Sequence, residues 1–164
     1  MDIRMRRFRQ TLPNEESEQI LREMINGVLA LTGVEDYPYA VPVSYVYDGQ
    51  FIYIHSAIEG HKIDCLRNNP KISFCVIKED NIIPEEFTTY YKSVIVFGTI
   101  SFITKESDKI YALKALADKY SPNIDSDGEI KKCLSHVAII RISIDSFSGK
   151  ESLELTRKRL KSES

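Results

Sequence analysis

The residues best suited to chemistry lie together in the segment from Tyr53 to Lys62. A strand-like run ends at His55 and Ser56, a short loop follows, and a helix is predicted to begin near Gly60. The free N–H groups and positive dipole end of a helix start are suited to an anion. Lys62 adds a cation in the first turn, where it costs stability unless an anion accompanies it. The segment therefore predicts a phosphate site.

Other kinds of site find less support in the sequence. The spacing of His55, His61 and Cys65 fits no standard metal site, so no metal is expected. The three cysteines contain no C-x-x-C pair, which predicts reduced thiols, with Cys65 and Cys75 in the core. His55 has no identifiable carboxylate partner and no nucleophile–base pair is evident, so the catalytic residues stay open.

The elements that must position this segment are mainly strands. Pro42 predicts an edge or bulged strand, Asp48-Gly49 a tight turn, and Gly98 a bulge or close backbone approach. Thr11 is predicted to cap the first helix and Gly27 to end it, while Ser148-Gly149 should end the last strand. We expect strands at 28–32, 39–47, 51–55, 71–77, 93–103 and 137–144, helices at 13–26, 60–69 and 104–120, an irregular functional loop at 78–91, and a turn-rich stretch at 121–129.

The whole chain reads as one domain over residues 1–164 with charged tails. Its formal net charge of −2 gives no electrostatic case for nucleic acid, and the basic runs 4–9 and 157–161 are typical of solvated termini. The first ten residues lack the apolar stretch of a secretion signal, and no apolar run is long enough to cross a membrane. We therefore expect a cytoplasmic protein with about six antiparallel strands and flanking helices, mainly β in class.

Several segments, in order along nearly the whole chain, resemble the pyridoxamine-phosphate-oxidase-like FMN-binding split barrels. The chain is most similar to the nitroimidazole-resistance branch of these flavin-nucleotide-binding proteins. The central segment is fairly specific, and the others support it. The matching segments are Met5-Arg6-Arg7, Gly27-Val-Leu-Ala-Leu, Tyr39-Ala-Val-Pro-Val-Ser-Tyr-Val-Tyr-Asp-Gly, Ile52-Tyr-Ile-His-Ser-Ala-Ile-Glu-Gly-His-Lys-Ile-Asp-Cys-Leu-Arg-Asn-Asn-Pro, Tyr91-Lys-Ser-Val-Ile-Val-Phe-Gly and Ile142-x-x-Asp-x-x-Ser-Gly-Lys.

The resemblance implies a split barrel that forms a homodimer, with flavin mononucleotide (FMN) at the subunit interface. Lys62 would pair with the phosphate, and relatives often carry arginine where His61 stands, which is a stronger phosphate partner than neutral imidazole. Tyr90 and Tyr91 are candidate pocket or interface residues. The remaining implied contacts are Pro42, Val43 and Ser44 along the flavin ring, His55, Ser56 and Ala57 between ring and phosphate, and Ser93 and Lys150 as ribityl or phosphate contacts that could come from the second subunit.

Three functions are compatible with this resemblance. The first is an FMN-dependent oxidoreductase acting on a small aromatic substrate, with nitro-group reduction as one candidate reaction. No G-x-G-x-x-G follows a strand, so NAD(P)H would have to dock transiently over the flavin. The second is a non-catalytic flavin-binding or redox-sensing module, and the third is a relative that uses haem or a deazaflavin, since a fold does not fix its function.

Overall fold

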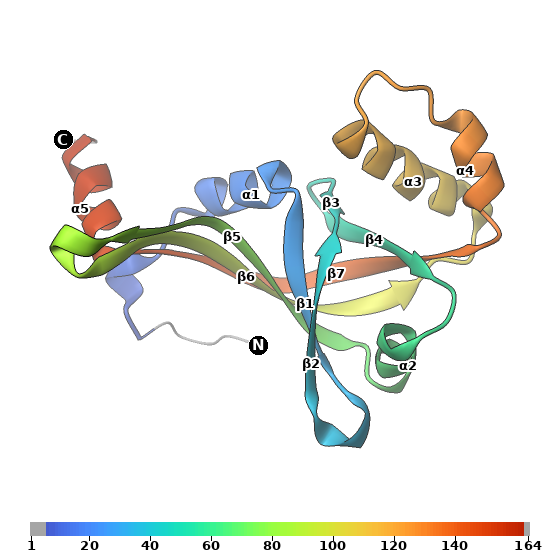
Figure 1. Ribbon diagram of the computed structural model, residues 1–164, viewed down its shortest axis with the longest axis horizontal. Coiled ribbons are helices and arrows are strands. Elements are labelled where there is room, and N and C mark those ends of the chain that lie inside the picture. The colour runs from blue at the N-terminus through green and yellow to red at the C-terminus, as the bar shows by residue number, and fades with distance from the viewer. Residues whose placement is uncertain (1–5, 163–164) are drawn as a thin grey trace.

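The computed structural model describes residues 6–162, and its framework is one antiparallel sheet of seven strands (Figure 1). The strand order is β2-β1-β5-β6-β7-β4-β3. This confirms a mainly β split barrel with flanking helices, with seven strands rather than six. The strands are β1 Asn26–Thr32, β2 Pro38–Ser44, β3 Val46–Tyr47, β4 Phe51–Ala57, β5 Lys71–Ile83, β6 Thr88–Phe102 and β7 Val137–Glu151. The helices are α1 Asn14–Glu23, α2 His61–Asn68, α3 Glu106–Tyr120, α4 Asp127–Cys133 and α5 Leu153–Ser162.

The sheet closes on itself because its two edge strands are joined through a single residue, Tyr45. One strand was expected over 39–47, but the ladder is interrupted between β2 and β3. The Tyr120 hydroxyl from α3 accepts the Tyr45 N–H at 2.8 Å and donates to the Tyr45 carbonyl at 2.8 Å. A side chain thus satisfies backbone groups that the ladder would otherwise pair.

Two clusters of buried side chains hold the helices to the sheet. The larger fills the barrel, where Ile20 and Leu21 of α1 and Ile63 and Leu66 of α2 meet the inward residues of the strands. The smaller lies outside the barrel, where α3 and α4 cover one face of β4 and β7 around Ile139. Helix α2 therefore belongs to the barrel interior, and α3 to its outer wall.

Strands β5, β6 and β7 continue beyond the barrel as a long arm that carries α5 near its end (Figure 1). The expected irregular loop over 78–91 is wrong, because β5 and β6 stay paired from Ile83↔Thr88 inward across a bulge. A 3-10 turn at Pro84–Glu86 reverses the chain. The expected end of the last strand at Gly149 is also wrong. Its carbonyl accepts the Leu12 N–H, and a Cβ there would lie 2.2 Å from the Ser17 Oγ.

The predictions for Pro42 and Gly98 are confirmed, whereas those for Gly27 and Thr11 are wrong. Pro42 does lie on an edge strand, and the ladder shifts register between Phe97 and Gly98 as a bulge requires. Gly27 does not end α1 but lies within β1, where a Cβ would meet the Phe74 ring at 2.3 Å. Thr11 makes no cap, since Pro13 occupies the cap position without a side-chain bond.

The turn-rich stretch and the basic ends of the chain are partly helical. Helix α4 occupies part of the stretch that was expected to be turns. The second basic run lies on α5, whereas the first begins outside the described residues, as does Met5. Over residues 6–162, no helix is both long enough and apolar enough to cross a membrane.

Candidate functional site

The junction of β4 and α2 holds the segment singled out from the sequence. Along β4 the side chains of Ile52 and Ile54 point into the barrel core, whereas His55 and Ala57 are exposed. Ser56 is half-buried at the mouth of the barrel. The predicted strand–loop–helix arrangement is therefore present, and it places His55 and Ser56 on opposite faces of the strand.

Helix α2 begins with uncapped backbone groups. Gly60 occupies the cap position with φ at 121°, a conformation that side chains disfavour, and no side chain caps the helix. The N–H groups of Ile63 and Asp64 donate to the Gly60 carbonyl at 2.8 and 3.1 Å. Those of His61 and Lys62 find no acceptor within residues 6–162. Such a helix start presents N–H donors to an anion.

Lys62 is a half-buried cation without an anion. Neither a carboxylate nor a hydrogen-bond acceptor from the described chain reaches its Nζ. Burial lowers the pKa of the Lys62 amine, since a charge removed from water is disfavoured unless it is paired. A phosphate beside the first turn of α2 would offset this cost, so the residues present fit the predicted group.

Strand β2 meets this helix start through one ring contact. The His61 ring lies edge-on to Tyr39 with the centroids 4.7 Å apart, and its Nε2 is 3.6 Å from the Cys65 Sγ. Further along β2, Pro42 and Ser44 are exposed, whereas Val43 packs in the core. Val43 can therefore offer a ligand only its backbone. Cys65 is buried as expected, but Cys75 is half-buried outside both core clusters.

Ser93 and Lys150 lie together, but far from the other predicted residues. They are paired on β6 and β7, and the Lys150 Nζ lies 5.5 Å from the centroid of the Tyr91 ring. On the same β7, His55 pairs with Ile139. The eleven steps from residue 139 to residue 150 span about 36 Å at the rise of an extended strand. One chain therefore does not bring Ser93 and Lys150 to the β4–α2 junction.

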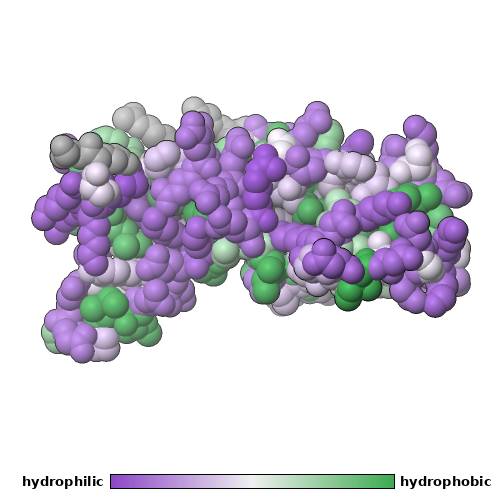
Figure 2. Space-filling view, turned by 90° about the horizontal axis from the view of Figure 1, so that it is seen from above, coloured by the Kyte–Doolittle hydropathy of each residue, from purple (hydrophilic) through white to green (hydrophobic). Residues whose placement is uncertain are grey.

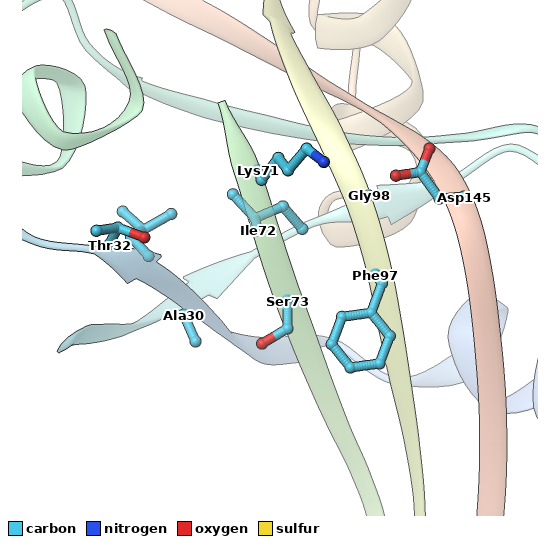
Figure 3. A pocket seen from close by; sticks show the side chains of 9 residues that line it. Ala30, Thr32, Lys71, Ile72, Ser73, Phe97, Gly98 and Asp145 are labelled. Carbon is cyan, nitrogen blue, oxygen red and sulfur yellow. The ribbon is translucent and has the colours of Figure 1, made fainter. Parts of the chain in front are cut away.

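A hollow of about 360 Å³ on the outer face of β1, β5, β6 and β7 was not predicted (Figure 3). Lys71 and Asp145 lie at one end of it, and Ser73 and Phe97 at the other. None of the nine predicted contact residues lines it. The sequence contains a signal for this hollow in two small residues, Ala30 and Ser73. They face outward on paired strands and leave this face of the sheet open.

The described residues contain no group of side chains that could hold a metal ion. Within residues 6–162, no three side chains of histidine, cysteine, aspartate or glutamate gather as a metal site would require. The geometry instead offers a helix start with a half-buried cation, which suits a phosphorylated ligand.

Comparison with known proteins agrees with this geometry. A family model described as pyridoxamine 5'-phosphate oxidase matches residues 13–151. A crystal structure from Bacteroides thetaiotaomicron, of a protein named for 5-nitroimidazole antibiotic resistance, is similar with a TM-score of 0.77 and 22% identity over 86% of each chain. The structure of an FAD- and haem-binding protein from Mycobacterium smegmatis is similar with a TM-score of 0.74 and 22% identity, over 88% of this chain and 74% of that one.

Two further relatives extend the comparison. An FAD-binding protein from Mesorhizobium loti has a TM-score of 0.65 and 26% identity, over 87% of this chain and 96% of that one. An uncharacterized protein from Rhizobium meliloti is 35% identical over 86 residues, which are 47% of this chain and 51% of that protein. The chain thus spans about half the length of the curated relative that it matches.

Proposed function

The chain belongs to the pyridoxamine 5'-phosphate oxidase family, and from that premise we propose that it binds FMN and acts as an oxidoreductase. The observation that carries the proposal is Lys62, a half-buried cation without a partner in the described chain, at the uncapped start of α2. A helix start with an unpaired cation is the combination that a phosphate group completes.

Each side chain near the junction has a definite part in this proposal. The phosphate would be held by the Lys62 ammonium, the N–H groups of His61 and Lys62, and the Ser56 hydroxyl. The flavin ring would extend from there past His55 and Ala57 toward β2, over the exposed faces of its last residues and the Val43 backbone. Because His61 stands where relatives often have arginine, which is the stronger phosphate partner, Lys62 carries most of the charge compensation.

The bound flavin would supply the electron transfer, and the protein would position it and exclude water. The substrate proposed is a small aromatic molecule, with nitro compounds as one candidate class, because a similar structure is named for nitroimidazole resistance. The electron donor proposed is NAD(P)H, bound transiently. The main alternative to FMN is FAD, because two similar structures are of proteins named for FAD binding.

We further propose that the site is shared between two copies of the chain. Ser93 and Lys150 lie about 36 Å along β7 from the junction, so they can reach the cofactor only from a second subunit. The open sheet face also exposes Ile77 by 54% and Ile95 by 41%. Two such faces packed together would cover this apolar surface and bring each arm to the partner's α2.

The test is the cofactor of the purified protein. We expect a yellow protein whose flavin, released by denaturation and separated by chromatography, is FMN, and whose colour bleaches when NADH or NADPH is added without oxygen. Released FAD would correct the cofactor, and a Soret band would indicate haem. A flavin that neither donor bleaches would favour the non-catalytic binding module. A colourless protein that takes up no flavin from excess FMN or FAD would contradict the proposal.

A further inference from the structure

A second pocket lies outside the barrel, between α3 and the outer face of β4 and β7, and the proposed flavin function does not use it. Its volume is about 280 Å³. We call it the α3 pocket. It is lined by Asp48, Gln50, Phe51, Tyr53, Ile103, Asp108, Tyr111 and Arg141.

The cation in this pocket is Arg141, and no carboxylate of residues 6–162 forms an ion pair with it. It is half-buried, with its guanidinium carbon 4.9 Å from the centroid of the Phe51 ring. Its Nε is fully buried and donates to no atom of residues 6–162. Ser101, directly opposite on β6, has a buried Oγ that is also unpartnered. Buried polar groups are normally hydrogen-bonded, so two neighbouring exceptions mark a guanidinium whose charge the surrounding protein leaves uncompensated, and a ligand in the pocket would pair with its accessible Nη groups.

The two acids that line the α3 pocket do not serve this cation. The Asp48 carboxylate accepts the N–H groups of Gln50 and Phe51 at 2.8 and 2.7 Å, and the Tyr111 hydroxyl at 3.2 Å. Asp108 lies 3.7 Å from the Lys105 ammonium and accepts from Ser107. Neither forms an ion pair with Arg141. The guanidinium therefore stays available to an incoming acceptor.

Three aromatic rings line the pocket among its polar side chains, and they are inclined to one another by 62° and 75°. The Tyr53 ring lies 6.2 Å from Phe51 and 5.9 Å from Tyr111 between centroids, so three aromatic side chains line one side. Ile103 adds an aliphatic surface. The exposed parts of these rings favour contact with a planar ring of a ligand, and a guanidinium fork matches a carboxylate. The two nearby carboxylates disfavour a dianion such as phosphate.

We propose that the α3 pocket binds a small monocarboxylate with a planar apolar body, of the size of benzoate, with its carboxylate on Arg141. Tyr53 precedes His55 by two residues on the same face of β4, so such a ligand would lie about 7 Å along the strand from His55, beside the proposed flavin ring. It would also join α3 to β7, since Tyr111 and Arg141 come from these two elements.

The experiment uses 4-fluorobenzoate as the probe, with the full chain as purified and its cofactor bound. In fluorine NMR, the wild-type protein should broaden the probe signal saturably, whereas the neutral analogue 4-fluorobenzamide should bind at least tenfold more weakly. Arg141→Gln should weaken probe binding at least tenfold. The matched control Arg22→Gln should not, because Arg22 also stacks on a ring, that of Tyr47 at 5.1 Å, but outside the pocket.

Backbone amide shifts of the wild-type protein locate the probe without relying on a variant. Shifts confined to Gln50, Tyr53, Tyr111 and Arg141 are expected. Shifts centred on His61 and Lys62 would place the probe at the flavin site and overturn the inference, as would equal binding of the benzamide or full binding by a folded Arg141→Gln. The flavin proposal is unaffected by either result, because cofactor release tests it separately.

Discussion

Lys62 and Lys119 are both half-buried lysines without a carboxylate partner, but only Lys119 donates a hydrogen bond to the described chain. The Lys119 Nζ donates to the Met24 carbonyl at 2.7 Å and lies 4.1 Å from the centroid of the Tyr45 ring. A carbonyl and a ring face both favour a cation, so Lys119 fastens α3 to the closure of the barrel. Lys62 has no such contact in the described chain, which leaves its charge for a ligand.

Replacing Lys62 by alanine should weaken FMN binding by about 1.5–3 kcal/mol, the range for a lost hydrogen bond to a charged group. Flavin fluorescence quenching during titration measures the affinity. Lys62→Arg should restore most of it, because the positive charge is kept. Lys131→Ala, a change at an exposed lysine on α4, should have no effect. Unchanged affinity in Lys62→Ala would remove this residue from the phosphate site.

Lys119 should leave a signature in the pH dependence of stability. Burial lowers the pKa of its amine to about 8 from 10.5, so between these values the unfolded chain binds more protons than the folded one. The cost of burying the charge is complete below pH 8 and is relieved as the pH rises. Relative to Lys119→Met, the unfolding free energy of the wild type should therefore increase from about pH 7.5 to about pH 9.5.

Urea denaturation of both proteins across this range measures that difference. The comparison with the variant is needed because other groups titrate nearby: burial raises the pKa of the Cys75 thiol, which acts in the opposite direction. Burial also raises the pKa of Tyr45, whose ring faces Lys119, so this phenol stays protonated in the folded protein across the window. Parallel curves for the two proteins would show that Lys119 keeps an ordinary pKa in the fold.

At the scale of elements, glycine shows what local sequence can and cannot predict. Gly98 interrupts an alternating apolar run, and the expected bulge is present. Gly27 and Gly149 looked like the ends of elements but lie inside strands, because a side chain from elsewhere packs against each of them. The Phe74 ring and the Ser17 hydroxyl that exclude a Cβ there are distant in sequence. The sequence around a glycine therefore does not distinguish one required by tertiary packing from one required by a turn.

Gly98→Ala should destabilise the protein by on the order of 1–3 kcal/mol, the range for overpacking. A Cβ at this position would lie 2.5 Å from the Ser143 carbonyl oxygen, and that backbone cannot move without breaking the β6–β7 ladder. Urea denaturation measures the loss. Gly128→Ala on α4 is the control: nothing lies within 4 Å of its Cβ position, so stability should hold or rise slightly. Equal effects would contradict the steric argument.

The sequence did not predict the paired strands of the arm or helix α4, because neither has a local pattern of apolar residues that indicates its structure. The polar residues Lys78, Glu79 and Asp80 predict a loop, but Glu79 and Asp80 pair with β6, and Lys78 lies at the bulge between the paired residues Ile77 and Glu79. Helix α4 is too short to be stable alone and depends on Ile130, which packs beneath α3. By contrast, α2 and α3 were predicted nearly to their bounds, because each buries an apolar stripe.

For the whole molecule, the two faces of the sheet have different roles. Seen from above, the side that carries α1, α3 and α4 is mainly hydrophilic, with hydrophobic residues in small separate groups (Figure 2). The hollow of Figure 3 and the exposed side chains of Ile77 and Ile95 lie on the sheet itself. The resemblance implied a dimer, and the structure adds two physical reasons for one: the length of β7 between the partners of His55 and Ser93, and the exposed apolar side chains of the open face.

Ile95→Glu should convert the proposed dimer into a monomer and reduce its bound flavin. The side chain is 41% exposed in one chain and lies between paired strands on the open face, so a carboxylate there would be buried without a partner on association. Light scattering after gel filtration gives the mass, and absorbance gives the flavin content. Ile124→Glu is the control, because Ile124 is 68% exposed between α3 and α4 and should change neither. If Ile95→Glu stays dimeric with full flavin, the open face is not the interface. If it becomes monomeric and keeps its flavin, Ser93 and Lys150 of a second copy do not contribute to the site.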